Sequence, residues 1–132
     1  MSPRILLIED NELNRQVVRD MLLVAGLRID EAESGSEGLR LFEDRTYDLL
    51  LLDLRMPDVD GFGVIDAVRT RRDDKAAVPI IVVSAEGGRD TRARCLALGA
   101  DDLITKPISM QALFESIEAV FSSKRFSDDL LT

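Results

Sequence analysis

The 132-residue sequence contains no histidine, and Cys95 is its only cysteine. An internal disulfide, a zinc site of the Cys/His kind and histidine-based acid–base catalysis are therefore excluded. The chain also lacks an apolar run near the roughly 18 residues that a membrane span requires. Residues 1–4 lead straight into an apolar run without the features of a signal peptide. We therefore expect a cytoplasmic protein that does not enter a membrane.

Positive charge is scarce. The chain has 17 Lys and Arg against 25 Asp and Glu, which gives a formal net charge of −8. Such a surface repels phosphate backbones, so we expect no direct nucleic-acid binding. Hydrophobic residues make up 45% of the chain and charged residues 32%, which is typical of a globular protein. The length suits one domain, which we assign to residues 1–125, with residues 126–132 as a short C-terminal tail.

Short apolar runs predict the strands of a sheet. The three clearest are continuous and only four residues long, at 5–8, 49–52 and 80–83. Continuous runs suit parallel strands that are covered on both faces. Two weaker strand patterns lie at 27–32 and 102–105.

Segments with helical spacing lie between these strands. The apolar face predicted for the first helix consists of Leu13, Val17, Val18, Met21, Leu22 and Ala25. Ser34 to Glu37 has the spacing of a capping box at the start of the second helix, and Gly26 and Gly99 suit helix ends. Strand and helix thus alternate five times, which indicates a doubly wound α/β sheet with right-handed crossovers.

Polar residues follow the ends of four predicted strands: Glu9 and Asp10, Asp53, Ser84, and Lys106. The carboxyl ends of parallel strands meet at one edge of a sheet, so we expect these side chains to converge there. Three carboxylates and one ammonium carry a net charge of −2, which a divalent ion with oxygen ligands such as Mg²⁺ would neutralise. A carboxylate beside Mg²⁺, a lysine and a hydroxyl is equipped to accept a phosphoryl group.

The order of these residues resembles the receiver domain of two-component response regulators. The resemblance covers about residues 4–123 and includes Met56-Pro57 after Asp53, the stretch 99–102 before the last strand, and Pro107 after Lys106. It implies a flavodoxin-like fold, with a single five-stranded parallel sheet in the order 2-1-3-4-5 and five flanking helices.

The resemblance also implies a role for each site residue. Asp53 would accept the phosphoryl group from the phosphohistidine of a histidine kinase or from a phosphotransfer protein. Asp10, Asp53 and the backbone carbonyl of Arg55 would bind Mg²⁺, and Glu9 would act through a bound water.

The remaining two site residues would contact the phosphoryl group. Lys106 would pair with it, after a cis peptide bond to Pro107, and Ser84 would donate a hydrogen bond to it. The implied protein is a switch rather than an enzyme, and it assists its own phosphorylation and dephosphorylation. It would act on a downstream effector, and a phosphorylation-dependent homodimer is compatible with this function.

Only 26 residues follow Lys106, too few for an effector domain. The sequence therefore leaves open a stand-alone receiver and a receiver taken from a larger regulator or hybrid kinase.

The sequence departs from the family at Leu103, where the family has Tyr or Phe. Arg55 and Glu86 flank the mouth of the site, where a partly exposed ion pair would contribute little stability. Gly87-Gly88 is expected to make the next loop mobile.

Other Asp- or phosphate-based functions fit the sequence less well. A phosphatase of the haloacid-dehalogenase kind also uses an Asp nucleophile and Mg²⁺, but it needs a second Asp where Arg55 stands. A dinucleotide site needs a glycine-rich turn, and an FMN site needs a Ser/Thr/Gly phosphate loop, at the position of 9–11. Steady turnover of substrate with product release would favour the phosphatase. A single stoichiometric phosphorylation would favour the switch.

Overall fold

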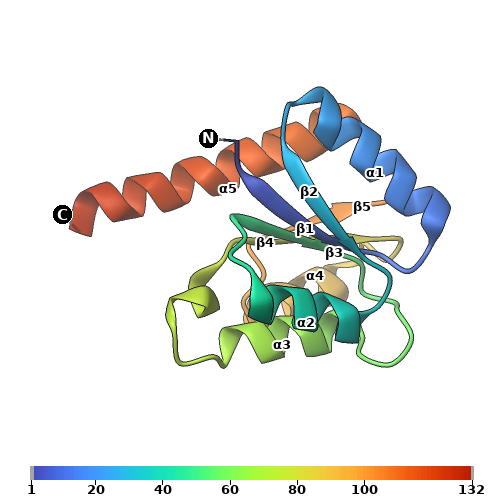
Figure 1. Cartoon of the computed structure of the whole chain (residues 1–132), viewed down its shortest axis with the longest axis horizontal. Helices are drawn as coiled ribbons and strands as arrows, with labels where there is room; N and C mark the ends of the chain where they lie inside the picture. The colour runs from blue at the N-terminus through green and yellow to red at the C-terminus, as the bar shows by residue number, and fades with distance from the viewer. Residues whose placement is uncertain (1, 132) are drawn as a thin grey trace.

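The computed structural model describes the backbone of residues 2–131 and the side chains of residues 2–123. Strands and helices alternate along the chain (Figure 1). In chain order they are β1 (Arg4–Ile8), α1 (Glu12–Val24), β2 (Arg28–Ala32), α2 (Gly35–Asp44), β3 (Leu49–Leu52), α3 (Gly61–Arg69), the short 3₁₀ helix η1 (Asp74–Ala77), β4 (Ile80–Ser84), α4 (Arg89–Leu98), β5 (Asp102–Thr105) and α5 (Met110–Leu131).

The sheet is parallel throughout and has the order β2-β1-β3-β4-β5, which confirms the predicted fold. Ile8, the last residue of β1, is in register with Ala32 of β2 and with Leu52 of β3. At the other side of the sheet, Ser84 is in register with Thr105. The strands therefore end at nearly the same level, so the residues after them meet at one edge.

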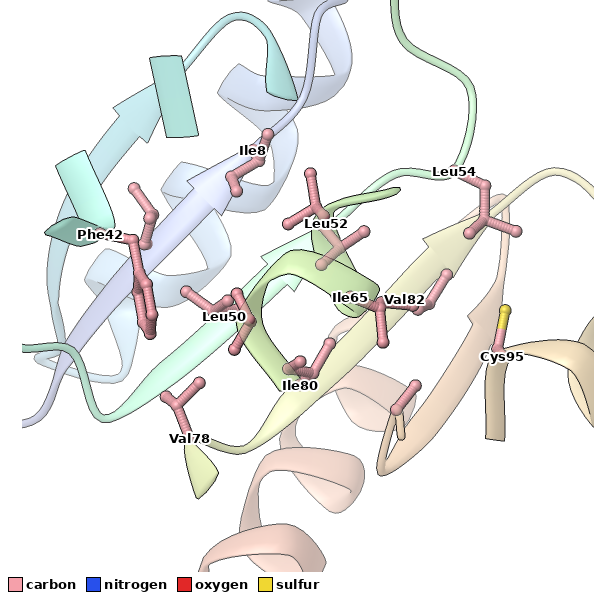
Figure 2. Packing of buried hydrophobic residues seen from close by; sticks show 14 of the residues in the cluster. Ile8, Phe42, Leu50, Leu52, Leu54, Ile65, Val78, Ile80, Val82 and Cys95 are labelled. Carbon is pink, nitrogen blue, oxygen red and sulfur yellow. The ribbon is translucent and has the colours of Figure 1, made fainter. Parts of the chain in front are cut away.

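Two apolar layers cover the sheet. Figure 1 shows α1 and α5 on one face and α2, α3 and α4 on the other. Alternate leucines of β3 serve the two layers: Leu50 and Leu52 pack with the α2–α4 side, and Leu49 and Leu51 pack with the α1–α5 side. Figure 2 shows the cluster on the α2–α4 side. All four leucines are 0–1% exposed, which explains why β3 is apolar without alternation.

Side chains at the helix ends largely match the predicted caps. The hydroxyl of Ser34 accepts a hydrogen bond from the Glu37 N–H at 3.1 Å. The Glu37 carboxylate, however, accepts from the Glu33 N–H at 3.2 Å instead of reaching the Ser34 N–H, so the second half of the capping box is shifted by one residue. Gly26 and Gly99 follow α1 and α4 with φ of 76° and 116°, a region that favours glycine.

The predicted apolar face of α1 is only partly correct. Val18 and Leu22 are buried against the sheet, but Leu13 and Val17 are 71% and 43% exposed. Arg15 takes a buried place instead, at 8% exposure. The apolar face of α1 is therefore wider than the part of the helix that the sheet covers. The covered part contains residues 15, 18 and 22.

The last helix continues through the segment that the sequence assigned to a tail. α5 ends at Leu131, and Figure 1 shows its C-terminal half projecting past the sheet. The end of the domain at residue 125 stays a prediction. Across residues 2–131, none of the helices combines the length and the apolar character that a membrane crossing needs.

Candidate functional site

Three carboxylates gather at the carboxyl edge of the sheet. Glu9 and Asp10 follow β1, Asp53 follows β3, and one oxygen from each lies within 4.8 Å of the others. The Asp53 N–H donates to the Ile8 carbonyl at 3.1 Å, which extends the pairing of β1 and β3 into the site. Glu9 is buried, Asp53 is half-buried and Asp10 is exposed, so the cluster opens toward solvent on the Asp10 side.

Lys106 reaches into this cluster from the other side of the sheet. Its Nζ lies 3.0 Å from Glu9 Oε1 and 3.3 Å from Asp53 Oδ2. Its backbone N–H donates to the Ser84 carbonyl at 2.8 Å, which ties the residue after β5 to the end of β4. The peptide bond between Lys106 and Pro107 is cis, as the family resemblance implies.

The site has an excess of negative charge. Burial raises the pKa of Glu9 from 4.5 to about 7, and the neighbouring Asp53 carboxylate adds to this rise. Burial by itself lowers the pKa of Lys106, but the hydrogen bond to Glu9 and the charge of Asp53 outweigh it and raise this pKa. The two raised pKa values indicate the same thing: Glu9 and Lys106 each hold a proton more firmly because the site lacks positive charge. Glu9 Oε2 is buried without a hydrogen-bond partner among the described residues.

Ser84 is at the predicted edge, but its hydroxyl does not contact the other site residues. The side chain is buried, and its Oγ accepts a hydrogen bond from the Glu86 N–H at 3.0 Å. Within residues 2–123 this oxygen donates to no other group. The structure thus brings together Glu9, Asp10, Asp53 and Lys106, and leaves the Ser84 hydroxyl in the turn after β4.

The mouth of the site lies between the loops after β3 and β4. Arg55 and Glu86 form the predicted ion pair across it, and both side chains are exposed. A groove of about 550 Å³ beside this pair is lined by residues that include Asp10 and Arg94. Whether the Arg55 carbonyl binds a metal stays a prediction.

Gly87 has a packing role that the sequence did not indicate. A Cβ at this position would collide with the side chain of Thr105, so glycine lets the loop after β4 approach β5 closely. Neither Gly87 nor Gly88 has a positive φ. The expected mobility of this loop stays a prediction, and the close approach is a second reason for glycine there.

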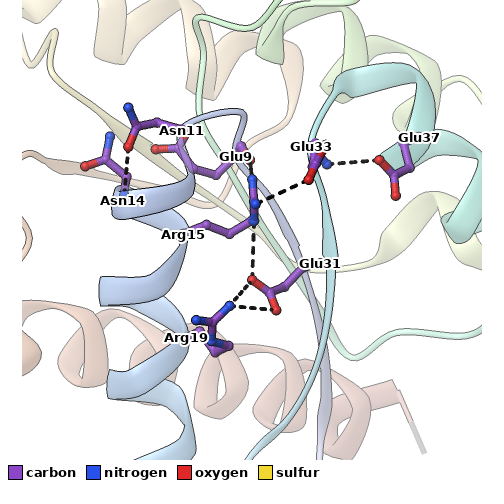
Figure 3. A network of polar contacts seen from close by, with 8 residues as sticks. All are labelled: Glu9, Asn11, Asn14, Arg15, Arg19, Glu31, Glu33 and Glu37. Atoms are coloured by element: carbon purple, nitrogen blue, oxygen red, sulfur yellow. Dashed lines mark hydrogen bonds and ion pairs between the residues drawn. The ribbon is translucent and has the colours of Figure 1, made fainter.

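Sequence reasoning missed one buried polar residue beside the site. Arg15 of α1 donates a hydrogen bond from its guanidinium to the Glu9 carbonyl at 2.8 Å (Figure 3). A signal was present in the sequence, because residue 15 shares a helical face with Val18 and Leu22. Its partners Glu31 and Glu33 lie 16 and 18 residues away in the chain.

Comparisons with known proteins agree with this geometry. The sequence model of the response regulator receiver domain matches residues 5–118. The chain is 39% identical over 117 residues to the cell cycle transcriptional regulator CtrA of Caulobacter vibrioides, a match that covers 89% of this chain and 49% of that protein. The chain thus spans about half the length of the curated relatives it matches.

Two solved structures are close in fold. One is a putative response regulator from Chloroflexus aurantiacus J-10-fl, with a TM-score of 0.88 and 24% identity over 92% of this chain and 99% of that one. The other is the receiver domain of the sensor histidine kinase PA1611 from Pseudomonas aeruginosa PAO1, with a magnesium ion coordinated in its active site cleft. Its TM-score is 0.84 and its identity 30%, over 92% of this chain and 99% of that one.

Proposed function

Since the chain belongs to the family of response regulator receiver domains, we propose that it accepts a phosphoryl group on the Asp53 carboxylate with the help of Mg²⁺. The observation that carries this proposal is the place of Asp53 between an acidic pair and a lysine. One of its oxygens lies 3.3 Å from Lys106 Nζ, and the Glu9 and Asp10 carboxylates each place an oxygen within 4.8 Å. The half-buried side chain stays accessible to a donor.

The residues of the site fit a magnesium ion. Glu9 Oε2 is a buried oxygen without a partner among the described residues, and the carboxylates of the cluster outnumber its lysine. Asp10, Asp53 and the carbonyl of Arg55 would hold the ion, with Glu9 acting through a water, and all of these are the oxygen ligands that Mg²⁺ prefers. Bound there, the ion supplies positive charge that screens the phosphoryl oxygens from the carboxylates. The related PA1611 receiver holds magnesium in its active site cleft.

Phosphoryl transfer from a phosphohistidine would then proceed in line. An Asp53 oxygen forms the new P–O bond, the P–N bond breaks, and the imidazole nitrogen keeps its electron pair. Lys106 is already close enough to Asp53 to pair with the incoming phosphoryl oxygens. The Ser84 hydroxyl keeps its proton for donation, because its oxygen only accepts from Glu86 within the described part of the chain. We infer that Ser84 moves toward the phosphoryl group after transfer.

This chemistry makes the protein a switch that assists its own phosphorylation and dephosphorylation. Its donor would be a histidine kinase or a phosphotransfer protein, and its output a change in binding to an effector or to a second copy of the chain. A cytoplasmic location fits a chain whose single cysteine, Cys95, is buried and unpaired. The phosphatase alternative finds no support in the site, because Arg55 stands at the position of the required acid and pairs with Glu86.

Mass spectrometry after incubation with Mg²⁺ and a small phosphodonor such as acetyl phosphate tests the proposal. We expect one phosphoryl group per chain, no labelling of Asp53→Asn, and loss of labelling in EDTA. Asp58→Asn is the matched control, since Asp58 is an exposed carboxylate in the same loop and should leave labelling intact. Labelling of Asp53→Asn at the wild-type level would remove Asp53 from this role.

A further inference from the structure

We propose that Arg15 is a positioning residue for the magnesium site: its guanidinium holds the Glu9 carbonyl and so fixes the backbone from which Glu9 and Asp10 project. This inference rests on the proposed function, because it concerns how the chain prepares its metal ligands. The contact of Arg15 with the site is to the Glu9 main chain and not to the carboxylates of the cluster.

The guanidinium of Arg15 is held in one place by three groups. One nitrogen donates to the Glu9 carbonyl at 2.8 Å, a second lies 3.4 Å from Glu33 Oε1, and Nε lies 3.4 Å from Glu31 Oε1. Figure 3 shows these contacts converging on Arg15 from β2, from Glu33 just after it and from Glu9 just after β1. The side chain is only 9% exposed, so water competes little for its donors.

The main chain of Glu9 is held from two sides. Its N–H donates to the Ala32 carbonyl of β2 at 3.1 Å, and its carbonyl accepts from Arg15. The peptide that joins Glu9 to Asp10 therefore has its carbonyl fixed by Arg15. Within the described side chains, residues 2–123, no hydrogen bond restrains the exposed Asp10 carboxylate. Its position thus depends on the peptide plane before it, which Arg15 sets.

Charge and position predict opposite effects of removing Arg15. A guanidinium near a cation site repels Mg²⁺, so loss of its charge alone should strengthen Mg²⁺ binding. Loss of its hydrogen bond to the Glu9 carbonyl should weaken binding, because the ligands are no longer held in place. Loss of outer contacts that orient metal ligands typically lowers metal affinity about 10- to 100-fold. The sign of the change therefore separates the two roles.

Arg19 provides a matched control on the same helix. It is one turn further along α1 and pairs with Glu31 at 2.9 Å, but among residues 2–123 no hydrogen bond or ion pair joins it to Glu9. Arg19→Gln removes the same charge and an ion pair to the same glutamate. Any general effect of weakening the α1–β2 contact should appear in both variants, and an effect on the ligand backbone should appear only when Arg15 is changed.

The test is a Mg²⁺ titration of wild type, Arg15→Gln, Arg15→Lys and Arg19→Gln, followed by isothermal calorimetry and by amide resonances. We expect Arg15→Gln to bind Mg²⁺ about tenfold more weakly, and Arg19→Gln to stay within about twofold of wild type because its ion pair is partly exposed. Arg15→Lys should bind with intermediate affinity, since an ammonium can still donate to the Glu9 carbonyl. Without metal, the Asp10 and Asn11 amides should exchange faster in Arg15→Gln than in Arg19→Gln.

Thermal melts of all four proteins show whether each is folded. If Arg15→Gln does not melt cooperatively, Arg15→Lys carries the test, and affinity equal to wild type would overturn the inference. Equal or tighter binding by folded Arg15→Gln would also overturn it. Failure of the wild-type protein to bind Mg²⁺ would instead refute the proposed function, so the two ideas fail in different ways.

Discussion

Glu9→Gln should stabilise the metal-free protein above neutral pH and have little stabilising effect in acid. The Glu9 carboxylate is buried beside Asp53, and its second oxygen has no partner among the described residues. Glutamine has nearly the same shape without the charge. The substitution therefore removes the repulsion from Asp53 and the cost of burying a charge, while it weakens the 3.0 Å contact with Lys106.

The size of the effect follows from the pKa of Glu9, which the folded protein raises from 4.5 to about 7. A tenfold change in a proton-binding constant corresponds to roughly 1.4 kcal/mol, so ionised Glu9 lowers the stability of the fold by about 3 kcal/mol. Between these two pKa values the folded state binds more protons than the unfolded state. The free energy of unfolding therefore falls as pH rises through this window, and the full loss is present above pH 7. Because glutamine gives up part of the contact with Lys106, we expect a net gain of about 1–3 kcal/mol.

Urea unfolding followed by circular dichroism, in EDTA at about pH 5 and about pH 8, measures this difference. The urea concentration at the wild-type unfolding midpoint should be lower at about pH 8 than at about pH 5. In Glu9→Gln this decrease should be much smaller. Glu118→Gln, at an exposed position of α5, should show the wild-type pH dependence. If Glu9→Gln were less stable than wild type by the same amount at both pH values, Glu9 would serve as the structural partner of Lys106. The repulsion argument would then be refuted.

Three other substitutions test the metal and the switch. Asp10→Asn should leave the metal-free protein at least as stable as wild type, because a carboxylate leaves a crowded cluster, and should remove most of the rise in melting temperature that Mg²⁺ causes; an unchanged response to Mg²⁺ would refute its role as a ligand. A phosphoryl mimic such as beryllofluoride should shift amide resonances mainly in residues 84–91, and Ser84→Ala should blunt this shift. Leu103→Ala should cost about 2–3 kcal/mol of stability and preserve the resonance shift. If the shift were lost in Leu103→Ala and kept in Ser84→Ala, the coupling would run through Leu103.

The sheet was predictable because each central strand is buried on both faces. Residues 5–8, 49–52 and 80–83 have no position that faces water, so their composition alone marks them as interior strands. The edge strand β2 is largely half-exposed and includes Asp30 and Glu31, and its sequence signal is correspondingly weak. The order of the strands came from the family resemblance, since periodicity indicates alternation but not which strands are neighbours.

The burial of Arg15 could not be assigned from helical periodicity alone. Helical spacing places residue 15 on the face of Val18 and Leu22, but an arginine is ordinarily expected to face solvent, and the apolar Leu13 is expected in the core. The structure reverses both, because Glu31 and Glu33 come beside α1 only after β2 pairs with β1. Charge complementarity between residues this far apart becomes visible only when the strand pairing is known.

The convergence of the acidic cluster was predictable, and the orientation of Ser84 was not. Glu9 and Asp53 follow strands that end in register, so strand ends alone place them together. The Ser84 hydroxyl can rotate, and a nearby donor in the next turn, the Glu86 N–H, determines which way it points. The position of a short hydroxyl side chain at a strand end thus depends on the turn that follows it.

That turn also connects the site to α4. Glu86 binds the Ser84 hydroxyl with its N–H and the Arg55 guanidinium with its carboxylate, so it joins the loops after β3 and β4 at the mouth of the site. If Ser84 moves toward a phosphoryl group on Asp53, we expect Glu86 to move with it and the pair with Arg55 to be disturbed. Behind the loop, Leu103 is buried, and its carbonyl accepts from Arg92 of α4 at 3.2 Å. Because Leu103 has no ring or hydroxyl to exchange between two positions, we expect a change at Ser84 to reach α4 mainly through the β4–α4 loop.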